Sequence, residues 1–277
     1  MKRTLGLTLL LFATLFSCMR QEKPLPAELS RAESVMWEHP DSALSILRSM
    51  PQSSLSSGKN YATWALLLAQ ARDKVYGKRL PDSLNIPSSD KLVQDAMDYF
   101  EKEGNLKRMA QTYYYKGQLL KDQKKITEAM PFFLKSKEMM TKLDEPLFTY
   151  LICQSLGNTY RYQDLYEESL VQLKDAYQYA LRSGNGERIS YALSELGRTY
   201  VHKNEMDSAL FYFGKSLDNA QRLGNIELEA MAMGELGVVY NKLSQGEKAL
   251  HYTRKELDLC LQISSLHKLP QVYYKIG

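Results

Sequence analysis

Apolar side chains recur at helical spacing over most of the chain, and the whole pattern repeats every 40 residues. Around Gly197, for example, Leu193, Leu196 and Tyr200 lie three or four positions apart, as they would on one face of a helix. The repetition is clearest in a column of glycines: Gly117, Gly157, Gly197, Gly237 and Gly277. A fixed period of this length indicates a structure built by stacking similar supersecondary elements.

Three further columns keep step with the glycines. The first four glycines are each followed by a small residue, then a bulky or medium one, then in three cases another small one: Ala129, Ser169, Ala209, Ala249; Phe133, Leu173, Phe213, Thr253; Ser136, Ala176, Ser216. Glu256 breaks the last column. Because a glycine inside a helix costs about 1 kcal/mol relative to alanine, its return in every repeat indicates close approach of a second helix. We expect the first small column to face the glycines, small against small, with tyrosine and phenylalanine filling the spaces between repeats.

Turn signals divide each repeat into two helices. Between repeats the chain reads Gly104-Asn105, Gly184-Asn185 and Gly224-Asn225, and glycine ends helices readily in the left-handed conformation. Within repeats, an acidic residue opens the second helix, where it meets the positive end of the helix dipole: Glu167, Asp207 and Glu247. The sequence therefore predicts an all-α chain of helical hairpins.

The order Leu-Gly-x-x-Tyr, alanine, phenylalanine, alanine resembles the tetratricopeptide repeat in a long, 40-residue variety. The resemblance implies a tetratricopeptide-type helical-hairpin solenoid coiled as a right-handed superhelix. Residues 110–269 fit four repeats (110–149, 150–189, 190–229 and 230–269), and 270–277 start a fifth, so we expect the protein to continue beyond it. Residues 26–109 are expected to form degenerate hairpins, with Asp90–Glu103 completing a first repeat after a helix over Tyr61–Val75.

The chain begins with Lys2 and Arg3, an apolar run over Leu5–Phe16, and Cys18. That run is too short to span a membrane, which takes about 20 residues, and is typical of a secretory signal over residues 1–17. Leu15-Phe16-Ser17 resembles the lipobox of bacterial lipoproteins, which implies lipidation of Cys18, with 18–25 as a lipid-anchored leash. Ordinary signal cleavage is the alternative.

The N-terminal region carries a second resemblance. The stretches Ala27–Met50 and Trp64–Lys74 resemble the N-terminal region of tetratricopeptide lipoproteins and signalling proteins of Bacteroidota. Together with the lipobox, this implies a membrane-anchored lipoprotein of the bacterial cell envelope, at the periplasmic face or the outer membrane.

Composition and motif content argue against several classes of function. The chain has 36 basic and 32 acidic residues, and removal of Lys2 and Arg3 with the signal leaves 34 basic residues, a balance that argues against nucleic-acid binding. We find no phosphate-binding loop, metal-ligand spacing or nucleophile–base arrangement in the sequence. Cys153 and Cys260 occupy core columns of different repeats. We therefore expect no catalysis, cofactor or metal.

The first helix of each repeat is expected to line the concave side, which repeat solenoids use for binding. Groove positions lie one residue and four to five residues after each glycine. The candidate peptide groove comprises Gln118, Lys121, Asn158, Arg161, Tyr162, Arg198, His202 and Asn241. If the peptide is acidic, Arg161 and Arg198 are the best candidates for bidentate carboxylate contacts. Since Arg198 is placed on the open face, its truncation to alanine is expected to leave stability nearly unaltered.

The leading hypothesis is a non-enzymatic scaffold that binds a protein or peptide partner and is tied to the membrane by its lipid anchor. The alternative is the sensory half of a membrane signalling or transcription-regulating protein whose output module lies beyond Gly277. A run of about 20 apolar residues after Gly277 would favour the sensor.

Overall fold

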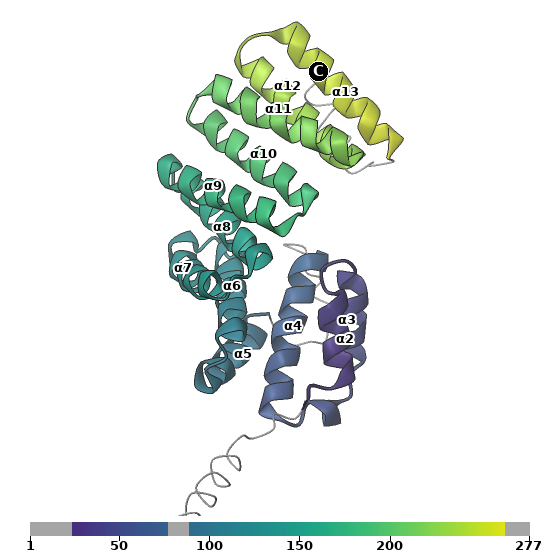
Figure 1. Ribbon diagram of the computed structural model, residues 1–277, viewed down its shortest axis with the longest axis vertical. Helices are drawn as coiled ribbons and strands as arrows, with labels where there is room; N and C mark the ends of the chain where they lie inside the picture. Colours follow the sequence, from purple (N-terminus) through teal and green to yellow (C-terminus); the bar gives the residue numbers. More distant parts are fainter. Residues whose placement is uncertain (1–23, 77–88, 264–277) are drawn as a thin grey trace, which may run out of the picture. The chain divides into compact units, whose positions relative to one another are not determined.

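The computed structural model describes residues 24–76 and 89–263, and within these ranges all regular structure is helical. The chain divides into two compact bodies, which meet in sequence between Leu80 and Pro81. We call them the N-terminal body and the repeat body, and describe each separately (Figure 1). The expected signal, Cys18 and most of the leash lie outside the described residues, as does the expected start of a fifth repeat.

The N-terminal body consists of α2 (Ala27–Val35), α3 (Pro40–Ser49), the short 3-10 helix η1 (Gln52–Leu55) and α4 (Gly58–Tyr76). Helices α2 and α3 pack on each other and on α4. Their buried side chains include Leu29, Leu44 and Leu66. The Trp64 indole donates a hydrogen bond of 2.9 Å to the carbonyl of Leu47, which fixes α4 against the end of α3.

The structure pairs the helices before the repeats differently from the sequence prediction. Helix α4 was expected to form one degenerate repeat with the helix over Asp90–Glu103. Instead, α4 packs on α2 and α3 in the N-terminal body, whereas α5 (Ser89–Glu103) packs on α6 in the repeat body. The apolar residues of α2 and α3 provide α4 with its own partners.

Four helical hairpins follow in the repeat body (Figure 1). They are α6 (Leu106–Asp122) with α7 (Ile126–Lys142), α8 (Pro146–Arg161) with α9 (Tyr166–Ser183), α10 (Gly186–His202) with α11 (Met206–Leu223), and α12 (Ile226–Lys242) with α13 (Gly246–Gln262). Each hairpin starts four residues before the boundary drawn from the glycine columns, at Leu106 rather than 110 in the first repeat. Successive first helices touch in series, α6 with α8, α8 with α10 and α10 with α12. We call the side that they form the first-helix face.

The caps between repeats confirm the turn signals. Gly104, Gly184 and Gly224 have φ of 75°, 67° and 63°, in the left-handed region that suits glycine. The asparagine after each glycine caps the next helix: the side chain of Asn185, for example, accepts a hydrogen bond of 3.0 Å from the backbone N–H of Arg188. The chain therefore stops and restarts a helix within two residues.

The glycine column does permit close approach, but its partner is not the one expected. A Cβ at Gly197 would lie 2.5 Å from Cε1 of Phe213, and one at Gly117 would lie 2.7 Å from Cε1 of Phe133. The expected packing of small against small is therefore wrong, because the bulky column fills the space above each glycine. Only the backbone of the small column comes close, as at Ser169, whose carbonyl would lie 3.3 Å from a Cβ at Gly157.

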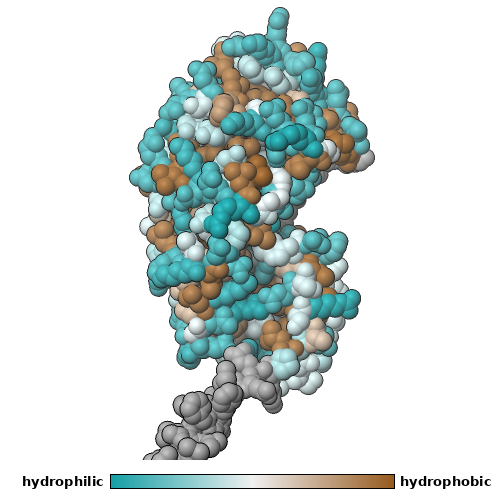
Figure 2. All heavy atoms as spheres, viewed as in Figure 1, coloured by the Kyte–Doolittle hydropathy of each residue, from teal (hydrophilic) through white to brown (hydrophobic). Residues whose placement is uncertain are grey.

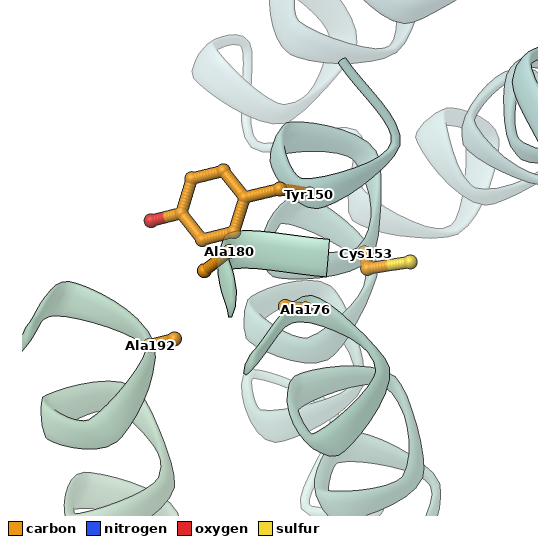
Figure 3. Packing of buried hydrophobic residues seen from close by; sticks show 5 residues of the cluster. All are labelled: Tyr150, Cys153, Ala176, Ala180 and Ala192. Atoms are coloured by element: carbon orange, nitrogen blue, oxygen red, sulfur yellow. The ribbon is translucent and has the colours of Figure 1, made fainter. Parts of the chain in front are cut away.

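Small residues instead pack at the contact between neighbouring repeats. Figure 3 shows Tyr150 and Cys153 of α8, Ala176 and Ala180 of α9, and Ala192 of α10 in one buried cluster. Alanine at these positions lets α10 settle between the two helices of the preceding hairpin. The face shown in Figure 2 is mainly hydrophilic, with apolar spots scattered over it.

Candidate functional site

A chain of ion pairs crosses the first-helix face from α8 to α12. Arg161 Nη2 lies 2.7 Å from Glu195 Oε2, and Arg198 Nη1 lies 2.6 Å from Glu195 Oε1. The other terminal nitrogen of Arg198, Nη2, contacts Oε1 of Glu235. We call these four residues the arginine–glutamate chain. It joins three consecutive repeats through their side chains.

Helical spacing explains why these residues meet. Glu195 and Arg198 are three positions apart on α10, so they share one face of that helix. Because α8, α10 and α12 touch in series, this face also meets the end of α8, where Arg161 lies, and the middle of α12, where Glu235 lies. Arg161 also donates to the Glu195 carbonyl and the Thr199 hydroxyl, both at 3.3 Å.

The four side chains of the arginine–glutamate chain are largely shielded from solvent. The side chains of Glu195, Arg161 and Glu235 are 9%, 11% and 13% exposed, whereas that of Arg198 is 39% exposed. Both carboxylate oxygens of Glu235 are buried, and Arg198 and the Ser194 hydroxyl are hydrogen-bond partners of this carboxylate. Burial raises the pKa of Glu235 to about 7, against the opposing influence of Arg198. The Glu235 carboxylate is therefore only partly compensated.

A cavity of about 390 Å³ opens beside the arginine–glutamate chain. Its described lining includes Arg161, Arg198 and Glu235 together with apolar side chains from α10 to α13: Val201, Phe213, Ala230, Met231, Val238 and Cys260. Roughly 300–1,000 Å³ is usual for ligand pockets. The cavity thus combines a few fixed charges with an apolar wall.

Gly234 and Glu256 also line the cavity. A Cβ at Gly234 would collide with the Glu256 carboxylate, which is buried. The absence of a side chain at 234 therefore provides the room that this carboxylate occupies. The sequence showed only that Glu256 breaks a column of small residues.

The structure gathers three of the predicted groove residues at the cavity: Arg161, Arg198 and His202. His202 is exposed, and its pKa is lowered by partial burial and by the charges of Arg161 and Lys242. It therefore stays neutral to lower pH than an ordinary histidine.

The other predicted groove residues lie away from this cavity. Lys121 Nζ donates to Gln118 Oε1 at 2.7 Å, and the Ser155 hydroxyl donates to the same oxygen at 3.3 Å. Asn158 has a buried Oδ1 that accepts no hydrogen bond among the described residues. Tyr162 is 68% exposed at the end of α8, and Asn241 is exposed near the end of α12.

Sequence reasoning missed the three carboxylates that define the site. It searched only positions that follow each glycine, whereas Glu195 and Glu235 come two residues before one. A usable signal was present in the spacing of Glu195 and Arg198, which is that of a helical ion pair. The structure shows that both predicted arginines are already engaged by carboxylates of this chain.

The described residues offer little for other chemistry. They contain no group of three or more His, Cys, Asp or Glu side chains able to hold a metal ion. Burial raises the pKa of Cys153 to about 12, so its thiol is protonated at neutral pH. Within the described ranges, every helix is too short or too polar to cross a membrane.

Comparison with known proteins places the fold. The apo form of RapI matches with a TM-score of 0.73 at 14% identity over 90% of this chain and 68% of its own. A Rap protein complexed with competence and sporulation factor matches with a TM-score of 0.63 at 12% identity over 96% and 78%. Nearly identical TPR-like repeats from Podosopora anserina match with a TM-score of 0.59 at 12% identity over 82% and 99%.

No family model and no curated protein matches the sequence. The structural matches, which all lie at low identity, concern the fold. The chain is an all-α, tetratricopeptide-type solenoid of helical hairpins, as the sequence predicted.

Proposed function

We propose that this protein is a non-enzymatic scaffold that binds a peptide or protein partner on its first-helix face. The observation that carries this proposal is the cavity beside the arginine–glutamate chain, where apolar walls and fixed charges come together. One similar solved structure is a Rap protein in complex with a factor, which shows a related fold engaged in a complex. Repeat solenoids present such extended surfaces for binding.

Site-specific photo-crosslinking tests the proposal. A photoreactive side chain at Val238, which lines the cavity and is 39% exposed, should capture the partner in cells. The same group at Lys174, an exposed position on the second helix α9, is the matched control. Capture from position 174 but not from 238 would place the binding surface on the second helices instead.

We also propose that the protein is a lipoprotein of the bacterial envelope, anchored through Cys18. The support is the lipobox-like sequence before that cysteine. Acyl chains contribute about 0.8 kcal/mol per buried methylene, so multiple chains hold a protein stably at a membrane. Cys18→Ala should release the protein from the membrane fraction or leave it unprocessed. A wild-type protein that is soluble and starts at another residue would refute the anchor.

The alternative proposal is the sensory half of a longer signalling protein of the Bacteroidota group. It rests on the resemblance of Ala27–Met50 to that group. Peptide sequencing of the protein purified from cells separates the two. A run of about 20 consecutive apolar residues after Gly277 supports the sensor, whereas a polar capping segment there supports the lipoprotein.

A further inference from the structure

We infer that the cavity beside the arginine–glutamate chain receives an uncharged, apolar side chain of the partner and discriminates against acidic and basic ones. The inference rests on the proposed function, because it names the part of the partner that the first-helix face would recognise. It departs from the expectation that Arg161 and Arg198 grip a carboxylate of the partner.

The two guanidiniums at the cavity already hold carboxylates of this chain. Arg161 lies 2.7 Å from Glu195, and Arg198 lies 2.6 Å from Glu195 and also contacts Glu235. An acidic side chain of the partner would have to displace one of these largely buried glutamates. Leaving a buried charge without its partner is strongly unfavourable. The cavity therefore discriminates against a carboxylate.

The carboxylates near the cavity are engaged as well. Glu195 contacts both arginines, and Glu235 has Arg198 and the Ser194 hydroxyl as hydrogen-bond partners. Glu256 is buried, and it too takes part in an interaction within the chain. A basic side chain of the partner would compete with these existing contacts and would lie beside two guanidiniums, which repel it. The cavity therefore discriminates against a cation too.

The series of ion pairs ends on α12, where the repeat pattern changes. Arg198 follows Glu195 by three positions, but the residue three positions after Glu235 is Val238. A valine cannot continue the ion pairs to a further carboxylate. Val238 is 39% exposed, and it gives the cavity aliphatic surface at the place where the preceding repeat has a guanidinium. The polar surface of the first helices thus gives way to apolar surface at α12.

The rest of the lining agrees with an apolar occupant. Val201 and Met231 are half-buried, whereas Phe213, Ala230 and Cys260 are buried. An apolar side chain placed against these residues would remove apolar surface of both molecules from water. The flexible thioether of methionine can adjust to the shape of such a side chain. A charged head group would instead lose its water and compete with contacts already in place.

Titration with blocked tripeptides tests the inference directly. The full chain, with carbon-13 in its methionine methyl groups, is titrated with acetylated and amidated tripeptides that carry leucine, glutamate or lysine at the centre. The methyl signal of Met231, which lines the cavity, is assigned from its loss in Met231→Leu. The leucine peptide should shift this signal in a saturable way, and the two charged peptides should not. Saturation by the glutamate or the lysine peptide, or by none of the three, overturns the inference.

A variant that extends the ion pairs of the preceding repeat locates the interaction. Val238→Arg recreates after Glu235 the spacing of Glu195 and Arg198, so the same helical ion pair should form and the variant should fold. Because it replaces aliphatic lining with a charge, the affinity for the leucine peptide should fall about tenfold or more, the scale of burying one large apolar side chain. Val171→Arg on α9, at a position that is 57% exposed, is the matched control and should leave the affinity unchanged. Equal affinities for wild type and Val238→Arg contradict the inference.

The response to salt tests the same point on the wild-type protein, without a substitution. The screening length falls from about 10 Å at 0.1 M salt to about 3 Å at 1 M. The affinity for the leucine peptide should be equal or higher at 1 M, because screening does not weaken the burial of apolar surface. A pronounced loss of affinity would reveal recognition of charge and overturn the inference.

Crosslinking from Val238 separates failure of this inference from failure of the proposed function. Successful crosslinking together with saturation by a charged peptide, or by none, rejects the apolar side chain but keeps the binding face. Failed crosslinking rejects the face itself.

Discussion

The carboxylate of Glu256 stands over Gly234 in the space that a side chain there would fill. In the preceding repeat the equivalent positions, 40 residues earlier, are Ser194 and Ser216, whose hydroxyl oxygens lie 3.0 Å apart. One repeat closes this space with two small hydroxyls, and the next with no side chain on one helix and a long acid on the other. The exchange conserves volume while introducing a charge beside the cavity.

This size compensation predicts a coupled pair of substitutions. Gly234→Ser alone should destabilise the protein by about 1–3 kcal/mol, because its side chain overlaps the carboxylate. Gly234→Ser combined with Glu256→Ser should recover much of this loss by recreating the hydroxyl pair of the preceding repeat. A double-mutant cycle from urea unfolding should show a coupling energy of about 1 kcal/mol or more. Additive effects would mean that the two positions do not share the space.

A second prediction concerns two glycines in one hairpin, whose replacement by alanine should change stability in opposite directions. Gly197→Ala should destabilise by about 1–3 kcal/mol, because the new Cβ would lie 2.5 Å from the Phe213 ring. Gly214→Ala on α11 has nothing within 4 Å of its Cβ and should stabilise by about 0.5–1 kcal/mol through helix propensity. Urea midpoints of the two variants measure this directly. Midpoints that move in the same direction would refute the close contact.

The ion pairs change the expectation for Arg198. The sequence placed this side chain on an open face, where truncation has little effect. Because it holds Glu195 and Glu235, Arg198→Ala should cost about 1–3 kcal/mol, less than the 3–5 typical of fully buried pairs since Arg198 is 39% exposed. Arg254→Ala on α13, at an exposed position, serves as control. Similar unfolding energies for both variants would show that the chain of ion pairs contributes nothing.

Glu235 predicts a specific pH dependence of stability. Its pKa is raised from 4.5 to about 7 in the folded protein, so the folded state binds this proton more tightly than the unfolded state. Its contribution to stability is therefore fully present below pH 4.5 and is lost as pH rises towards 7, with an upper bound of about 3 kcal/mol. Glu235→Gln should lack this decline, so the difference in stability between variant and wild type should change between pH 4.5 and 7. A pH profile parallel to that of the wild type would contradict the raised pKa.

Local rules were sufficient to predict the hairpins. Gly184 and Asn185 end one helix and cap the next through their own conformational preferences, so their role can be read from two residues. The partner of Gly197 could not be read in this way. Whether a glycine faces a small or a bulky column depends on how far Phe213 reaches across the hairpin, which is set by the rotation of the two helices.

The site was harder to predict because it depends on contacts between repeats. Arg161 and Arg198, two of the predicted groove residues, line the cavity. Their partners Glu195 and Glu235 lie 34 and 37 residues further along the chain, at offsets that differ from the 40-residue period. Only the packing of α8, α10 and α12 brings these arginines and glutamates into contact. A pattern sought in single columns therefore finds the cations and misses the anions that neutralise them.

The arginine–glutamate chain also affects how the protein comes apart. In a repeat solenoid, unfolding spreads according to the interface energies between neighbours. Opening the hairpin of α10 and α11 would strip partners from Arg161 on one side and from Glu235 on the other. Backbone amides of α8, α10 and α12 should therefore exchange hydrogen at a common rate, as one cooperative block, while those of α6 fray independently. The ion pairs that shape the cavity thus set the size of the segment that must unfold together.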